Sequence, residues 1–224
     1  MNLYFLVEGR RTESKVYPRW LGYLVPQLER VQVYDEVEDN NYYLFNGGGF
    51  PSIYDHIINS IHEVNEVNNY DYLAICLDAD EATVTERTEE IYNLLEKKSV
   101  TLKNCRLQII IQNRCIETWF LGNSAIYPRF PDNSRLADYQ RFYNVSTDDP
   151  ELMGIYEGFN SYSQFHKDYL KLMLLERHIR YTVNNPNGVI ENSYLNDLKD
   201  RVEVEPDHLR SFQTFLEFCE SLVT

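Results

Sequence analysis

The segment LYFLVEGRRTE, residues 3–13, contains the strongest indication of the fold. The apolar run from Leu3 to Val7 is typical of a strand that is buried on both faces. Glu8 ends this run, and a helical pattern begins at about Glu13, with Thr12 as the expected N-cap. A buried strand that leads directly into a helix is the building unit of an α/β fold.

The same alternation of short apolar runs and longer amphipathic stretches continues to about residue 123. Further strands are predicted within 31–45, at 72–77 and at 107–112, and helices at 13–29, 51–67 and 83–97. Every one of these helices follows a strand, which favours parallel pairing. We therefore expect an α/β fold with a mostly parallel, Rossmann-like sheet flanked by helices, and a ligand site beyond the carboxyl ends of its strands.

Beyond Asn123 the pattern becomes helical. An irregular connection or short helical insert is expected at 127–150, followed by helices at 163–181, 190–202 and 206–223. The sequence thus indicates a first domain over residues 1–123 and a C-terminal helical extension over residues 124–224. The extension is a candidate for contact with nucleic acid or with a partner protein.

Composition limits the classes of function. A net charge of -14 over 224 residues argues against broad electrostatic wrapping of nucleic acid, so any nucleic acid must be held locally. The four cysteines form no CxxC pair, which argues against a zinc knuckle or a disulfide framework. Since no stretch approaches the apolar length of a membrane span, we expect a cytoplasmic protein without a membrane partner.

Acidic residues stand where the predicted strands end. Glu8 follows the first strand, Asp78 and Asp80 follow the strand at 72–77, and Glu117 lies shortly after the strand at 107–112. Carboxylates gathered at one sheet edge repel one another unless a cation lies between them. Mg²⁺ and Mn²⁺ prefer oxygen ligands and also bind phosphate. The sequence therefore predicts a site for Mg²⁺ or Mn²⁺ at this edge.

Each acidic residue taken alone also has a structural explanation. Asp80 can cap a helix that begins near Ala82, and Glu13 can stabilise the N-terminal end of its helix through the macrodipole. These roles do not account for Glu8 after a fully apolar strand, or for Asp78 in addition to Asp80. For the set as a whole, we favour the metal site.

The segments LVEGRRTE, LDAD and IETWFLGN, in this order over roughly the first 123 residues, resemble the Toprim nucleases of the overcoming-lysogenization-defect (OLD) and RloB-like groups. Many of these nucleases serve in bacterial anti-phage defence. The resemblance implies that Glu8 is a catalytic and metal-binding glutamate and that Asp78 and Asp80 form the metal-binding, catalytic pair. Glu13 and Glu117 match acidic positions beside the core motif and are candidate metal ligands.

This resemblance implies Mg²⁺- or Mn²⁺-dependent hydrolysis of phosphodiester bonds in DNA or RNA, tRNA included, by the effector of an anti-phage or abortive-infection system. Two other classes of function stay open: a phosphatase or phosphotransferase for small nucleotides, and a non-hydrolytic binding subunit of an ATPase complex. The chain has no Walker motif, so an OLD-type ATPase would be a separate protein. The sequence is also compatible with an oligomer.

Arginines lie beside the acidic motifs. Arg10 and Arg11 follow Glu8, and Arg114 precedes Glu117. The planar guanidinium group is well suited to phosphate, so these three residues are candidate contacts to nucleic acid. Salt bridges that neutralise the acidic cluster are the alternative explanation, and the two roles are compatible.

Two further features have less specific interpretations. Lys167 and Lys171 lie, together with His166, on the basic side of the helix predicted at 163–181. This side is either a solvated face or a local groove for a nucleic-acid backbone. The glycine triplet 47–49 precedes a predicted helix, where a flexible turn is favoured over a phosphate cradle.

Overall fold

The computed structural model describes residues 1–223, which form two compact units. The first unit contains Met1–Leu77, Val84–Ile111 and the chain from Phe215 onward, and the second contains Asp78–Thr83 and Gln112–Thr214. These units differ from the predicted ranges 1–123 and 124–224, because the chain enters the second unit at the ends of two strands and returns within its last helix.

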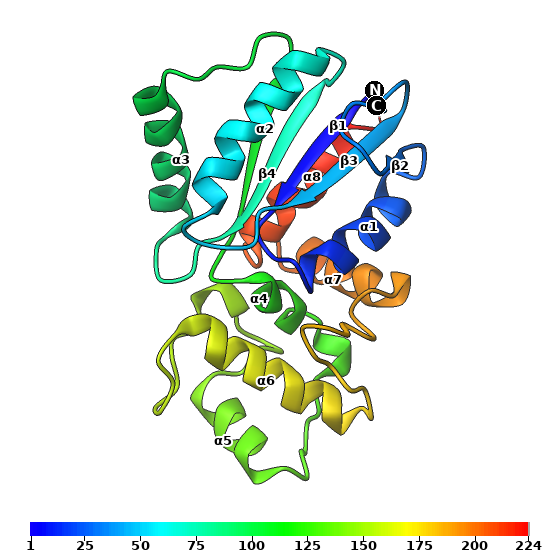
Figure 1. Ribbon diagram of the computed structural model, residues 1–224. Coiled ribbons are helices and arrows are strands. Elements are labelled where there is room, and N and C mark those ends of the chain that lie inside the picture. Colours follow the sequence, from blue (N-terminus) through cyan, green and yellow to red (C-terminus); the bar gives the residue numbers. More distant parts are fainter. Residues whose placement is uncertain (224) are drawn as a thin grey trace. The chain divides into compact units, whose positions relative to one another are not determined.

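The first unit is built on a five-stranded parallel sheet with the order β2-β3-β1-β4-β5 (Figure 1). The strands are β1 Leu3–Val7, β2 Glu29–Val31, β3 Asn41–Asn46, β4 Tyr72–Asp78 and β5 Arg106–Gln112. The central strand β1 pairs in parallel with β3 and β4, and Val7 lies opposite Asn46 and Cys76. All residues of β1 are buried. The predicted α/β fold with a parallel sheet is therefore confirmed.

Helices cover both faces of this sheet (Figure 1). They are α1 Glu13–Leu24, α2 Ile53–Val67, α3 Val84–Lys98 and the C-terminal part of α8 Arg210–Ser221. On one face, the ring of Phe5 lies 5.0 Å from that of Tyr17 in α1, which lies 5.4 Å from that of Phe215 in α8. On the other face, the hydroxyl of Tyr4 donates to Glu63 of α2 over 2.5 Å. Neighbouring residues of β1 thus anchor opposite helical layers.

In the first unit, three local expectations differ from the structure. The first helix ends at Leu24 rather than Glu29, because residues 29–31 form the edge strand β2. The strand expected within 31–45 is β3, which begins only at Asn41. Thr12 occupies the N-cap position of α1, but its side chain makes no capping hydrogen bond.

The second unit is helical, as predicted for the C-terminal extension. Its elements are α4 Ile116–Leu121, η1 Ser124–Ile126, α5 Ser134–Phe142, η2 Pro150–Leu152, α6 Tyr162–Glu176, α7 Asn192–Val204 and residues 210–214 of α8. The short helix α4 is buried on all sides. Trp119 Nε1 in α4 donates to Ser211 Oγ over 2.7 Å, and Thr118 Oγ1 hydrogen-bonds His166 Nδ1 over 2.7 Å. The helix α5 forms inside the segment expected to be irregular or a short helical insert.

A buried carboxylate stabilises the start of α8 within the second unit. Glu151 Oε1 accepts hydrogen bonds from the N–H of Ser211 over 3.0 Å and from its hydroxyl over 2.5 Å. Burial raises the pKa of Glu151 to about 7. Burial also lowers the pKa of His166 to about 4, so this histidine is neutral in the folded protein at neutral pH.

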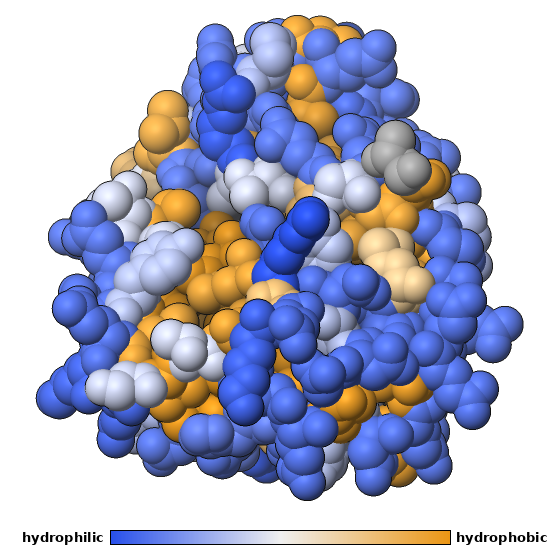
Figure 2. Space-filling model, turned by 90° about the horizontal axis from the view of Figure 1, so that it is seen from above, coloured by the Kyte–Doolittle hydropathy of each residue, from blue (hydrophilic) through white to orange (hydrophobic). Residues whose placement is uncertain are grey.

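The face of the molecule in Figure 2 is largely hydrophilic, with apolar surface visible in the hollows between polar side chains. Within residues 1–223, no helix has both the length and the apolar character needed to cross a membrane.

Glu151 and His166 predict opposite effects of pH on stability. The pKa of Glu151 is about 7 in the folded state against an ordinary 4.5, so its stabilising effect is lost as the pH rises through this window. The pKa of His166 is about 4 against an ordinary 6.5, so its stabilising effect is lost as the pH falls through that window. Each effect amounts to about 3 kcal/mol over its full range.

The measurement is the free energy of unfolding in urea at a series of pH values. Relative to the unsubstituted protein, Glu151→Gln should gain stability as the pH rises from about 4.5 to 7. His166→Gln should instead gain relative stability as the pH falls from 6.5 to about 4. If the relative stability of both variants changed in the same direction as the pH rises, the burial of these groups in their assigned protonation states would be contradicted.

Candidate functional site

In the first unit, the turns after β1 and β3 lie side by side at the carboxyl edge of the sheet. The N–H of Glu8 donates to the carbonyl of Cys76 in β4 over 3.1 Å, which extends the pairing of β1 and β4 beyond Val7. The N–H of Gly47 donates to the carbonyl of Val7 over 2.9 Å. The partly exposed Glu8 is therefore held at this edge beside the glycine turn that follows β3.

The glycine turn packs against Glu8 and Arg10. Gly48 and Gly49 have φ angles of +73° and +88°, which favour glycine. A Cβ on Gly48 would lie 2.7 Å from Nε and Nη2 of Arg10, so the guanidinium lies directly against the backbone of Gly48. A Cβ on Gly49 would lie 4.0 Å from Glu8 Oε1. The turn is thus shaped around the carboxylate and the guanidinium, which sequence reasoning did not foresee.

Glu13 belongs to the same cluster. A Cβ on Gly9 would lie 2.0 Å from Glu13 Oε2, so the backbone after Glu8 leaves space for this carboxylate only because residue 9 is glycine. Glu13 is buried at the start of α1, whereas Arg11 is exposed. The first unit therefore brings together Glu8, Arg10 and Glu13.

In the second unit, the two aspartates occupy a turn that runs along the end of β5. Asp78 is the last residue of β4, and Asp80 has a left-handed φ of 52°. The N–H groups of Ala79 and Asp80 donate to the carbonyls of Gln112 and Arg114, each over 2.9 Å. Backbone hydrogen bonds therefore fix the orientation of the turn that carries the predicted metal-binding pair.

The side chain of Arg114 also hydrogen-bonds to this turn. Its Nη1 donates to the carbonyls of Asp80 over 3.2 Å and of Ala82 over 2.9 Å. Its guanidinium lies 3.9 Å from the ring centroid of Tyr162 in α6, and the N–H of Tyr162 donates to Glu81 over 3.2 Å. Arg114 thus positions the aspartate turn, and the contact to phosphate predicted for it stays a prediction.

Glu117 and Asp78 lie near the same buried thiol. Burial raises the pKa of Cys115 well above its ordinary value, and the negative charges of Glu117 and Asp78 raise it further. Glu117 is buried in the first turn of α4 and accepts a hydrogen bond from the hydroxyl of Tyr181 over 2.9 Å. Sequence reasoning missed Tyr181, because no local pattern distinguishes it among the 18 tyrosines of the chain.

On α6, Lys171 is exposed and Lys167 is partly exposed, as expected for a basic face. The placement of His166 on this face was wrong, because its side chain is buried and bonded to Thr118. The helical period explains the difference: His166 lies four residues before Leu170, which is also buried, and so shares the apolar side of the helix.

The acidic residues supply oxygen donors, which are the ligands that hard divalent cations prefer. Among the residues that the structure describes, no group of three or more His, Cys, Asp and Glu side chains has the arrangement of a metal site. Mg²⁺ is commonly held by only one or two carboxylates, and water and substrate phosphate fill its other positions. The carboxylates of Asp78 and Glu117, near one thiol, supply oxygen ligands of the required type.

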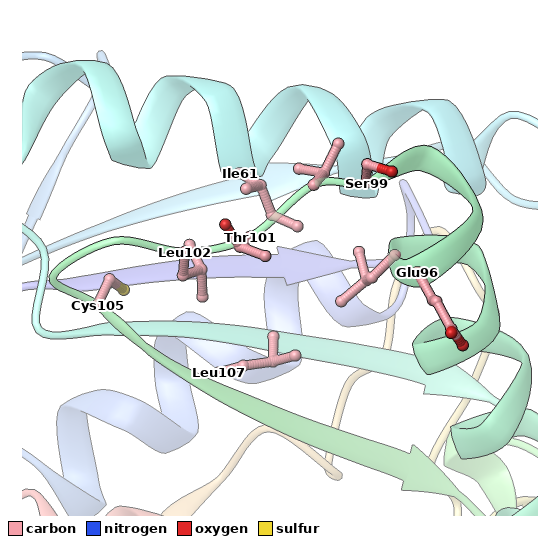
Figure 3. A pocket seen from close by; sticks show the side chains of 9 residues that line it. Ile61, Glu96, Ser99, Thr101, Leu102, Cys105 and Leu107 are labelled. Carbon is pink, nitrogen blue, oxygen red and sulfur yellow. The ribbon is translucent and has the colours of Figure 1, made fainter.

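A separate pocket lies at the opposite end of β5. It has a volume of about 350 Å³ and is lined mainly by aliphatic side chains from α2, α3 and the segment before β5. Figure 3 shows Ile61, Leu102 and Leu107 around this space. None of the predicted catalytic or phosphate-binding residues lines it, so it is distinct from the candidate site.

The chain matches no protein-family profile, no curated protein and no solved structure. The similarity to Toprim nucleases therefore rests on the sequence motifs alone.

Because Arg10 packs on Gly48, the loss of stability caused by substituting Gly48 should depend on the Arg10 side chain. Gly48→Ala should lower the free energy of unfolding by about 1–2 kcal/mol, because alanine disfavours a positive φ and its Cβ meets the guanidinium. Gly22→Ala is the matched control. Gly22 lies in α1 with open space around it, so alanine should raise stability there by about 0.5–1 kcal/mol.

Denaturant unfolding of Gly48→Ala, Arg10→Ala and the double variant completes the test. Removing the Arg10 side chain should relieve part of the cost of Gly48→Ala, because the clash disappears while the backbone strain remains. Strictly additive effects would show that the guanidinium does not rest on this glycine.

Proposed function

We propose that this protein is a Mg²⁺- or Mn²⁺-dependent enzyme that hydrolyses phosphodiester bonds in nucleic acid. The observation that carries the proposal is the position of acidic residues at the ends of two neighbouring parallel strands: Glu8 follows β1, and Asp78 ends β4. Ligands of parallel α/β sheets bind at this edge. Asp80 follows on a turn that backbone hydrogen bonds hold in place.

The proposed roles follow from the chemistry of each group. In the second unit, Asp78 and Asp80 are the proposed ligands of the cation, and Glu117 is a further acidic group near the same buried thiol as Asp78. Glu8 and Glu13, in the first unit, are the acidic groups that the sequence motifs add to this proposal. The bound cation supplies neutralisation of the charge that grows on the phosphoryl oxygens. A carboxylate oxygen of Glu8 takes the proton of the attacking water, because this side chain is partly exposed to solvent.

Arg10 is the best supported of the proposed phosphate contacts. Its guanidinium lies against Gly48, beside the glycine whose Cα faces the Glu8 carboxylate. The planar fork of arginine can bind two oxygens of one phosphate. Arg11 is exposed directly after it and is proposed to contact a neighbouring phosphate.

The proposed biological role is that of a nuclease effector in a bacterial anti-phage or abortive-infection system, and it rests on the resemblance to OLD and RloB-like nucleases. A separate OLD-type ATPase is the proposed protein partner. A phosphatase or phosphotransferase acting on small nucleotides is the second candidate. The net charge of -14 favours it, because a small nucleotide needs no extended basic surface.

Cleavage assays on plasmid, single-stranded DNA and total tRNA, each with Mg²⁺ and with Mn²⁺, test the proposal. Glu8→Gln and Asp78→Asn should each lower the cleavage rate by about 100-fold or more, because they remove a proton acceptor and a charged metal ligand. Glu89→Gln, an exposed acidic residue on α3, is the matched control and should cleave normally.

The outcomes separate the candidates. Full activity of both Glu8→Gln and Asp78→Asn would reject the assigned site. Hydrolysis of nucleotides without cleavage of any polymer would favour the small-nucleotide enzyme. Binding of nucleic acid without hydrolysis under any of these conditions would favour the non-hydrolytic subunit.

A further inference from the structure

The loop between η1 and α5 presents an aromatic ring to solvent. Phe130 is 92% exposed, the highest value among the exposed large hydrophobic side chains of residues 1–223. Its neighbour Arg129 is also exposed. A single exposed apolar side chain is ordinary on a protein surface, so exposure alone assigns no role to Phe130. A second observation, the way in which the loop is attached to α6, supports a role for this residue.

Two consecutive residues at the C-terminal end of α6 clamp the loop on both sides of its tip. Arg177 donates from Nε and Nη2 to the carbonyls of residues 126 and 127, each over 3.0 Å. Glu176 accepts the N–H groups of Asp132 over 3.2 Å and Asn133 over 2.9 Å. In Figure 1 the chain passes close to this end of α6 on its way to α5.

The tip itself is short and stiff. Gln140 of α5 donates to the carbonyl of Pro128 over 2.7 Å, which adds a third attachment. Pro128 and Pro131 flank the tip, and each proline fixes its own φ angle. The backbone that carries the exposed ring is therefore restrained, so a ligand that binds the ring loses little conformational entropy in the loop.

Exposed positive charges lie at the tip and on or just after α6, although the chain is acidic overall. Arg129 lies at the tip, Lys171 is exposed on α6, and Arg180 is exposed just after α6. Arg177 adds a further positive charge at the clamp. The carboxylate of Glu176 accepts the backbone N–H groups of Asp132 and Asn133, and the exposed Asp132 adds one negative charge beside the tip.

We propose that Phe130 is a stacking platform for an unpaired base of single-stranded nucleic acid, and that the neighbouring Arg129 contacts the adjoining phosphate. Proteins that bind single strands combine exposed aromatic rings with basic side chains in this way. In a duplex both faces of each base are already stacked, so an isolated ring has no free base to contact. The inference rests on the proposed function, because it names single-stranded segments as the form of nucleic acid that this protein acts on.

Fluorescence anisotropy with short labelled single strands of DNA and RNA, and with the matching duplexes, tests the platform in the full chain. EDTA is present throughout, so that binding is measured without cleavage. Phe130→Ala should weaken binding of the single strands by about tenfold, and Phe130→Trp should preserve it, because indole also stacks on bases. Leu152→Ala is the control, since Leu152 is another apolar residue of the second unit and is 75% exposed.

The clamp gives an independent variant. Glu176→Ala keeps the ring but releases the N–H groups of Asp132 and Asn133, so it should weaken binding less than Phe130→Ala does. Arg129→Ala should lower the salt dependence of single-strand binding, because fewer counterions are released. Duplex binding should not depend on Phe130.

Equal affinity of the unsubstituted protein and Phe130→Ala for single strands would overturn the proposal, as would absence of single-strand binding. A change in sedimentation with Phe130→Ala, but none in affinity for nucleic acid, would instead identify a contact between copies of the chain and would also overturn it. If the protein proved not to cleave nucleic acid, an affinity for single strands that depends on Phe130 could still be measured in EDTA. The proposed activity and the proposed stacking platform are therefore tested separately.

Discussion

The parallel pairing of β1 with both β3 and β4 is the constraint on which the candidate site depends. It makes the chain leave these strands at one edge of the sheet, and hydrogen bonds continue the pairing past the last strand residues, from Glu8 to Cys76 and from Gly47 to Val7. The position of Glu8 is therefore a property of the sheet rather than of a free loop. The glycines after β3 then let the backbone approach the Glu8 carboxylate and the Arg10 guanidinium closely.

The second unit depends on hydrogen bonds between buried polar groups. Its buried helix α4 is surrounded by polar groups whose partners lie far away in sequence, such as Trp119 with Ser211 and Glu117 with Tyr181. The guanidinium of Arg114 stacks on Tyr162 and donates to the carbonyls of the aspartate turn, so this arginine positions the turn. Buried polar groups are costly unless paired, and this network therefore fixes both the helices and the acidic turn.

Sequence reasoning was strongest where the apolar pattern was dense. The strands β1, β4 and β5 and the helices α2 and α3 lie within a residue or two of their predicted ends, because their buried faces show as runs or periods. The edge strand β2 was missed because residues 29–31 are short and largely exposed, so they carry no such pattern.

The site was predictable only in part. The order of Glu8, Asp78 and Asp80 at strand ends follows from the alternation of strands and helices. The close approach of Arg10 to Gly48 depends on the packing of two separate turns, and the burial of His166 depends on the orientation of α6 in its own unit. The exposure of Phe130 could not be predicted either, because the sequence does not show whether a loop keeps an aromatic residue outside the core.

Titration of the isotope-labelled protein with Mn²⁺, followed by paramagnetic broadening of its amide NMR signals, is the most direct measurement of the cation site. If Glu8, Asp78 and Asp80 hold a hard cation, the signals of residues 8–9 and 78–80 should broaden at the lowest Mn²⁺ concentrations. Early broadening confined to other acidic surfaces, such as the exposed Glu86 and Glu89 on α3, with residues 8–9 and 78–80 unaffected, would contradict a metal site at the carboxyl ends of β1 and β4.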